Sequence, residues 1–216
     1  MRRVLALTVL LVLAPACAAI PERAYFPSPS DPETRALSNA LWRAAGAAGD
    51  DPTRYSFAML DSRDVSAYTA DDAIFYFSKG LARQPRPVVE ALVAHEVAHE
   101  LLGHAGRRRA LALSLAAGFT VLGVVVPGLG LLDLLVHPLI VRAYTRDQEI
   151  AADLKAAELL RAMGYEAPRR TLAGALREAA KINGPPRGGW LAAEPDLVDR
   201  LAALEPLEPP DLAASK

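Results

Sequence analysis

The sequence predicts an α+β fold that is mostly helical, with a small antiparallel sheet beside one central helix. Apolar residues recur at helical spacing in several long segments, among them 33–48 and 147–165. Two short runs, 55–60 and 72–77, are rich in aromatic residues and have the length of strands. The chain has 216 residues, 52% of them hydrophobic, which is enough for one domain with a buried core.

The first 19 residues are typical of a targeting segment. Arg2-Arg3 is followed by an apolar run and by the small residues Ala14-Pro15-Ala16, which predict a signal peptide and its cleavage site. The only cysteine, Cys17, comes next, where a bacterial lipoprotein carries its lipid, although Ala14 stands where leucine is usual. An ordinary secretory signal is the alternative. Either route predicts export to the cell envelope, on the periplasmic or extracytoplasmic side.

The rest of the chain divides into three parts by composition. Residues 20–32 are rich in proline and serine, which predicts a tether without packed structure. Residues 33–205 are expected to form the folded domain, and residues 206–216 a disordered tail. The first helix of that domain, 33–48, has three large apolar residues spaced to bury one face: Leu37, Leu41 and Trp42.

The strongest chemical signal is the run His95-Glu96-Val97-Ala98-His99. It lies in a largely apolar segment, which predicts a buried helix with a polar stripe. Residues four apart share a helical face, so His95 and His99 can point two imidazoles at one metal ion. Glu96 can reach a water bound to that metal and take its proton. This is the H-E-x-x-H pattern of zinc peptidases, with two ligands and one base on one helix.

The predicted strands lead directly into this helix, so we expect the sheet edge to line the cleft. An extended peptide can add to such an edge through backbone hydrogen bonds; the alternative is that the sheet only packs. His104 follows the helix motif. Peptidases that take a third histidine ligand need the longer spacing H-E-x-x-H-x-x-G-x-x-H, whereas Gly103 immediately precedes His104. This favours a surface residue, or one behind the ligands, over a ligand.

Residues 110–141 are almost wholly apolar, with a break at Pro127-Gly128. The first half is near the lower length limit for crossing a bilayer, and the second half is shorter and holds Asp133 and His137. The pattern predicts a helical hairpin that folds onto the domain or dips into the membrane. Transmembrane spans are the alternative.

Glu149 and Asp153 lie four residues apart on the helix predicted after this hairpin. A zinc site with two histidines needs a third protein ligand, and Glu149 is the candidate. Asp153 can then accept a hydrogen bond from the outer nitrogen of a ligand histidine. A solvated acidic face is the alternative. Two further helices are expected at 168–182 and 195–204.

The pairing of HEVAHELLGH with the later EIAADLKAAELLRAMGY resembles the HtpX-like zinc metallopeptidases, relatives of the CAAX prenyl endopeptidases and of BepA-like periplasmic proteases. The likeness covers residues 55–205. It implies a zincin-like domain that holds one zinc ion (Zn2+) per chain. The implied roles are ligand for His95, His99 and Glu149, base for Glu96, and support of a ligand for Asp153.

Two departures from the family pattern concern the cleft. Ser66-Ala67-Tyr68 stands where the family often has Asn-Ala-Phe. Glu194 stands where the family typically has a histidine before proline, while Arg200 matches the arginine of its last helix. Near the zinc, Glu194 would close the water site or help to bind substrate; otherwise it is an exposed acid at a helix start.

These observations predict a zinc metalloendopeptidase of the cell envelope that hydrolyses misfolded or unassembled envelope proteins with zinc-activated water. The substrate class comes from the resemblance alone. One alternative is a non-catalytic, zinc-stabilised factor that binds clients or assists assembly. Another is an integral membrane peptidase in which 110–141 spans the bilayer and Cys17 is unmodified. A formal net charge of -1 gives no indication of nucleic-acid binding.

Overall fold

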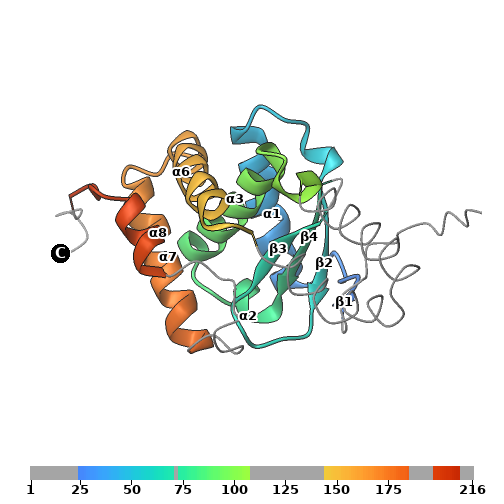
Figure 1. Cartoon of the computed structure of the whole chain (residues 1–216). Coiled ribbons are helices and arrows are strands. Elements are labelled where there is room, and N and C mark those ends of the chain that lie inside the picture. The colour runs from blue at the N-terminus through green and yellow to red at the C-terminus, as the bar shows by residue number, and fades with distance from the viewer. Residues whose placement is uncertain (1–23, 71–72, 108–143, 185–196, 210–216) are drawn as a thin grey trace, which may run out of the picture.

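The computed structural model describes residues 24–70, 73–107, 144–184 and 197–209 (Figure 1). It confirms the α+β, mostly helical prediction. The elements in chain order are β1 (Ala24–Tyr25), α1 (Pro32–Ala47), the short 3-10 helix η1 (Pro52–Arg54), β2 (Ser56–Leu60), β3 (Ala67–Thr69), β4 (Ile74–Ser78), α2 (Lys79–Ala82), α3 (Arg86–Leu101), α6 (Arg146–Ala162), α7 (Pro168–Asn183) and α8 (Leu197–Ala203).

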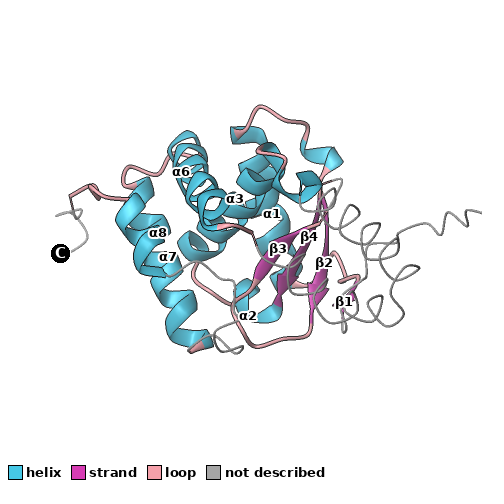
Figure 2. Cartoon of the chain, viewed as in Figure 1, coloured by secondary structure: helices cyan, strands magenta, loops and turns pink. Residues whose placement is uncertain are grey.

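The four strands form a mixed sheet in the order β1-β2-β4-β3, with most of the helices gathered on one side of it (Figure 2). The two predicted strands correspond to β2 and β4, and these run parallel, so the prediction of an antiparallel sheet is wrong for this pair. The reason lies in the loop between these two strands, residues 62–70. Residues 67–69 of that loop form β3, which pairs antiparallel with β4. The extra reversal returns β4 to the direction of β2.

The sheet contributes to two apolar clusters, because side chains alternate between its faces. Phe75 and Phe77 of β4 are fully buried in the main core, together with residues of α1, α3, α6 and α7. Tyr76 lies on the opposite face, where it forms a small second cluster with Ala58 and Leu60. The predicted strands therefore supply both layers of packing around the sheet.

Helix α3 lies in the middle of the domain (Figure 1). All its residues from Val89 to His99 are buried. Helices α1, α6 and α7 and strand β3 all contact it. A helix enclosed on every side is held in place by packing all round, so polar side chains on it have fixed surroundings.

Helix α1 buries only part of the predicted face. Leu37 and Leu41 are in the core, but the side chain of Trp42 is 58% exposed. Trp42 is the next residue after Leu41, about 100° further round the helix, and the small residues Ala40, Ala44 and Ala45 complete the buried face in its place.

The predicted unpacked segments both contain packed residues. Ala24–Tyr25, within the tether 20–32, pairs with β2 as the edge strand β1. In the tail 206–216, Leu207 packs against the core, and the carboxylate of Glu208 accepts hydrogen bonds from two backbone amides at the start of α7. Proline-rich composition indicates little regular structure, but it does not exclude these tertiary contacts.

Three predictions fall outside the described residues: the targeting segment with Cys17, the apolar hairpin 110–141, and Glu194. Within the described ranges, none of the helices combines the length and the apolar character that crossing a membrane requires.

Candidate metal centre

Helix α3 supplies both histidines of the site. His95 and His99 lie one turn apart, and their side chains are almost fully buried. Their Nε2 atoms are 3.0 Å apart, so the two rings converge on one point. Because α3 is packed on all sides, it fixes the positions from which both imidazoles extend.

Helix α6 supplies the third group through its first turn. Thr145 caps the helix in a capping box with Gln148. The Thr145 hydroxyl accepts a hydrogen bond from the backbone N–H of Gln148 at 3.3 Å, and Gln148 Oε1 accepts one from the backbone N–H of Thr145 at 2.9 Å. This cap fixes where α6 begins and therefore where Glu149 lies. The Glu149 side chain is buried against the two histidines.

The three side chains fit a tetrahedral metal ion. Glu149 Oε2 is 3.2 Å from His95 Nε2, and Glu149 Oε1 is 3.5 Å from His99 Nε2. Ligands that bind zinc tetrahedrally at about 2.0–2.1 Å lie about 3.3 Å from one another. All three ligand atoms lie within 4.8 Å of one another. Two histidines and one glutamate are also the donor set of open catalytic zinc sites.

Asp153 lies behind His95. Its side chain is fully buried, and Oδ1 is 3.0 Å from His95 Nδ1, the nitrogen that points away from Glu149. Arg200 of α8 donates to the same carboxylate from Nε at 2.7 Å and from Nη2 at 2.6 Å. Arg200 Nη1 is also 3.1 Å from Glu149 Oε2. One guanidinium thus binds both Asp153 and Glu149.

These contacts set the charges of the side chains in the site. Burial and the Arg200 cation lower the pKa of His95, but its hydrogen bonds with Asp153 and Glu149 outweigh them and raise that pKa. Burial raises the pKa of Glu149, but hydrogen bonds with the two histidines hold it well below its ordinary value. Burial also raises the pKa of Asp153, and the hydrogen bonds from Arg200 and His95 overcome this and lower it. Both acids are therefore ionised and stabilise cations.

His104 is a buried neighbour of His99. Helix α3 ends at Leu101, and Gly103 takes a left-handed φ of 64° that turns the chain back. The His104 ring then lies with Nδ1 3.0 Å from His99 Nδ1 and is only 3% exposed. Burial and the adjacent His99 lower the pKa of His104 to about 4, so it is neutral at pH 7 and can accept a hydrogen bond. The predicted surface position is wrong; the position behind a ligand agrees with the structure.

Two residues that the sequence analysis did not select complete the surroundings. The Tyr144 ring stacks on His99, with ring centroids 3.8 Å apart. The hydroxyl of Thr69 on β3 lies 2.7 Å from Glu96 Oε2. Tyr144 directly precedes Thr145, and the Thr145–Gln148 capping box at the start of α6 is a pattern that can be recognised in the sequence. Nothing in the local sequence distinguishes Thr69.

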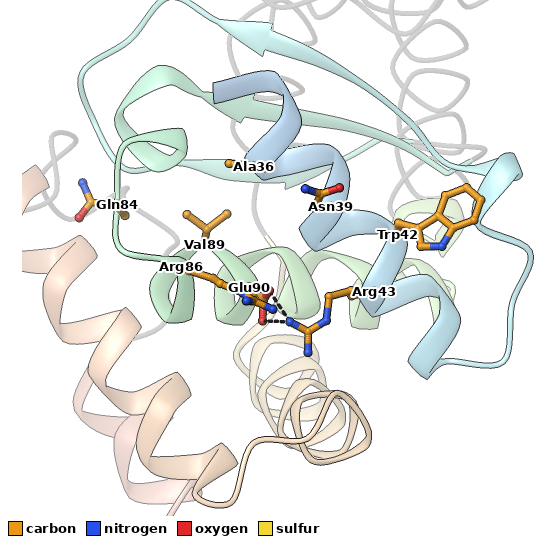
Figure 3. A pocket seen from close by; sticks show the side chains of 8 residues that line it. All are labelled: Ala36, Asn39, Trp42, Arg43, Gln84, Arg86, Val89 and Glu90. Carbon is orange, nitrogen blue, oxygen red and sulfur yellow. Dashed lines mark hydrogen bonds and ion pairs between the residues drawn. The ribbon is translucent and has the colours of Figure 1, made fainter. Parts of the chain in front are cut away.

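A separate hollow of about 440 Å3 lies between α1 and the start of α3 (Figure 3). Its acidic residue, Glu90, is nearly buried and accepts hydrogen bonds from Arg43 Nη1 at 2.7 and 2.9 Å, from Arg86 Nε at 2.7 Å and from the Tyr165 hydroxyl at 2.7 Å. Arg43 also donates to the backbone oxygen of Met163 at 2.6 Å. This network joins α1, α3 and the end of α6, and the described residues around it include no convergent group of metal ligands.

The structure therefore brings together the predicted residues of the helix motifs. His95, His99 and Glu149 converge, Glu96 lies beside them on α3, and the groups behind them are Asp153, Arg200 and His104. The site combines an H-E-x-x-H helix with a glutamate from a second helix, the arrangement that defines a metal-dependent peptidase.

The comparisons agree with this class. The sequence profile of peptidase family M48 matches residues 31–208. The chain belongs to this family of zinc metallopeptidases, as its resemblance to HtpX-like enzymes predicts. A comparison with curated proteins returned no match.

Proposed function

We propose that this chain is a zinc endopeptidase that binds one zinc ion through His95, His99 and Glu149. The observation that carries the proposal is the convergence of three buried side chains: the two histidine Nε2 atoms are 3.0 Å apart, and the Glu149 carboxylate oxygens lie 3.2 Å and 3.5 Å from them. Bound there, zinc lowers the pKa of its water ligand and polarises the scissile carbonyl.

The residues around the metal site have separate roles in catalysis and in metal binding. Glu96 accepts the proton of the attacking water and returns it to the leaving amine. Asp153 and His104 hold the outer nitrogens of His95 and His99, which keeps Nε2 of each ring free to bind metal. Arg200 keeps Asp153 in place and offsets the negative charge of the two acids.

The substrate we propose is an extended polypeptide that lies along β3. In the described part of the sheet β3 is the edge strand, and its Tyr68 pairs with Tyr76 of β4. On either side of this pair, the Ser78 amide donates to the Ser66 carbonyl oxygen and the Ala70 amide donates to the Ile74 carbonyl oxygen. The peptide group of Ala67 therefore faces away from β4, in the direction where another strand would add, whereas the carbonyl oxygen of Thr69 on that side lies 3.4 Å from the Tyr144 hydroxyl. Because β3 contacts α3, such a peptide would pass close to the metal ligands.

We further propose that the protein acts in the cell envelope on misfolded or unassembled proteins. The targeting pattern of residues 1–19 and the position of Cys17 support export and lipidation. Labelling cells with radioactive palmitate tests the anchor: the wild type should carry label and Cys17→Ser should not. An unlabelled wild type would refute lipidation.

The central test is zinc content and casein cleavage for the full chain in detergent. We expect about one zinc per chain and cleavage for the wild type, and zinc without cleavage for Glu96→Gln. Glu100→Gln, the same change one turn further along α3, is the matched control and should cleave. Bound zinc without cleavage in the wild type would favour the non-catalytic client-binding factor, and absence of zinc would refute the metal site.

A further inference from the structure

The hydroxyl of Thr69 contacts the carboxylate of Glu96. The residue is fully buried, and its Oγ1 lies 2.7 Å from Glu96 Oε2 and 2.9 Å from the backbone oxygen of Glu96. Neither oxygen of Glu96 has a hydrogen to offer when the carboxylate is ionised, so the hydroxyl is the donor. The carboxylate is the closer and the charged acceptor, and hydrogen bonds to charged acceptors are the stronger ones.

We propose that Thr69 is a positioning residue that holds the Glu96 carboxylate in the orientation its work as a base requires. This inference rests on the proposed peptidase function. A glutamate side chain has several rotatable bonds, and a general base must keep one oxygen within hydrogen-bond reach of the attacking water. The Thr69 hydroxyl engages Oε2 and leaves Oε1 to accept the proton.

The location of Thr69 gives this contact a second consequence. Thr69 pairs with Phe75 in the β3–β4 ladder, and its carbonyl oxygen lies 3.4 Å from the Tyr144 hydroxyl. The Tyr144 ring in turn stacks on His99. The strand along which we place the substrate is therefore joined to the base through a side chain and to a metal ligand through one aromatic ring. Thr69 would therefore set the distance between the substrate backbone on β3 and the Glu96 carboxylate.

Two conservative substitutions separate positioning from packing. Thr69→Val keeps the shape and volume of the side chain but removes the hydroxyl, and Thr69→Ser keeps the hydroxyl but removes a methyl group. If Thr69 only fills space, valine should be tolerated and serine should be the worse replacement. If the hydroxyl holds Glu96, the order is reversed.

The experiment uses the full zinc-loaded chain and measures kcat, KM, zinc affinity by chelator competition, and melting temperature. We expect Thr69→Val to lower kcat by about tenfold to a hundredfold, the loss that follows from one hydrogen bond to a charged group. Its KM and zinc affinity should stay within about twofold of the wild type, because Glu96 is not a ligand. Thr69→Ser should keep most of kcat. If Thr69→Val does not fold, Thr69→Ala takes its place.

A wild-type kcat in Thr69→Val, or an equal loss in Thr69→Ser, would overturn the proposal. Crystal structures of the same zinc-loaded variants give a readout that does not need activity. The Glu96 carboxylate should be displaced in Thr69→Val and in place in Thr69→Ser; an unmoved carboxylate in Thr69→Val would also overturn it. If the wild type binds zinc but cleaves nothing, the peptidase function fails, and the position of Glu96 still decides the role of Thr69.

Discussion

Replacing Asp153 with asparagine tests whether the charge behind His95 supports the metal site. The wild-type carboxylate is fully buried, lies 3.0 Å from His95 Nδ1 and accepts two hydrogen bonds from Arg200. Asparagine keeps the shape but has one oxygen and an NH2 group. The NH2 group must therefore face either the arginine or the imidazole N–H, and both of these are donors.

The expected loss of zinc affinity in Asp153→Asn can be estimated from these contacts. A hydrogen bond to a charged group contributes about 1.5–3 kcal/mol, and loss of a partner behind a ligand histidine typically weakens metal binding by about 10-fold to 100-fold. The two ranges agree, because tenfold corresponds to about 1.4 kcal/mol. We therefore expect the Kd for zinc of Asp153→Asn to rise about 10-fold to 100-fold.

Chelator competition at pH 7 measures this Kd directly. Asp147→Asn is the matched control, because Asp147 lies in the first turn of the same helix but is exposed, and its Kd should equal that of the wild type. A folded Asp153→Asn protein with the wild-type Kd would refute the argument that Asp153 supports the ligand.

Three further predictions concern His104, Glu90 and Gly80. His104→Ala should weaken zinc binding by about tenfold, measured by the same competition, because His99 Nδ1 loses its partner; an unchanged Kd would exclude that role. Burial raises the pKa of Glu90, but its hydrogen bonds, of which the one from Tyr165 has the largest effect, lower this pKa overall. The ionised carboxylate therefore stabilises the fold above pH 4.5. This stabilisation is lost as the pH falls through the lowered pKa. Glu90→Gln should therefore cost about 2–4 kcal/mol of unfolding free energy at pH 7 and less in acid, measured by urea unfolding at several pH values; a pH-independent difference would contradict this. Gly80→Ala should cost about 2 kcal/mol or more in the same assay, because a Cβ would overlap the carbonyl oxygen of Arg63, whereas Gly174→Ala, in open space on α7, should be neutral or stabilising; equal effects would refute the steric argument.

Much of the site was predictable because helical periodicity places its residues. His95, Glu96 and His99 lie on one helix, and Glu149 and Asp153 lie on another, so a spacing of four residues decides which of them share a face. Metal coordination then requires the two faces to meet, which the pairing of the motifs indicates before any fold is known.

Other parts of the site depend on contacts between distant segments. Thr69 and Glu96 meet only because β3 packs on α3, and Arg200 reaches Asp153 only because α8 packs on α6. Neither residue has a local pattern that encodes its partner. His104 shows the same limit, because its spacing from His99 is readable but the turn at Gly103 that buries it is not.

The sheet shows most clearly the difference between what the local sequence predicts and what tertiary packing decides. Its two central strands were readable from aromatic and apolar runs, but their direction was not, because a three-residue edge strand is too short to stand out from a loop. The sequence alone determined the chemistry of this protein: two histidines, a base and an acid at fixed helical offsets. Only the tertiary structure decided what holds those groups in place, since burial and hydrogen bonding across segments arise from packing and not from spacing.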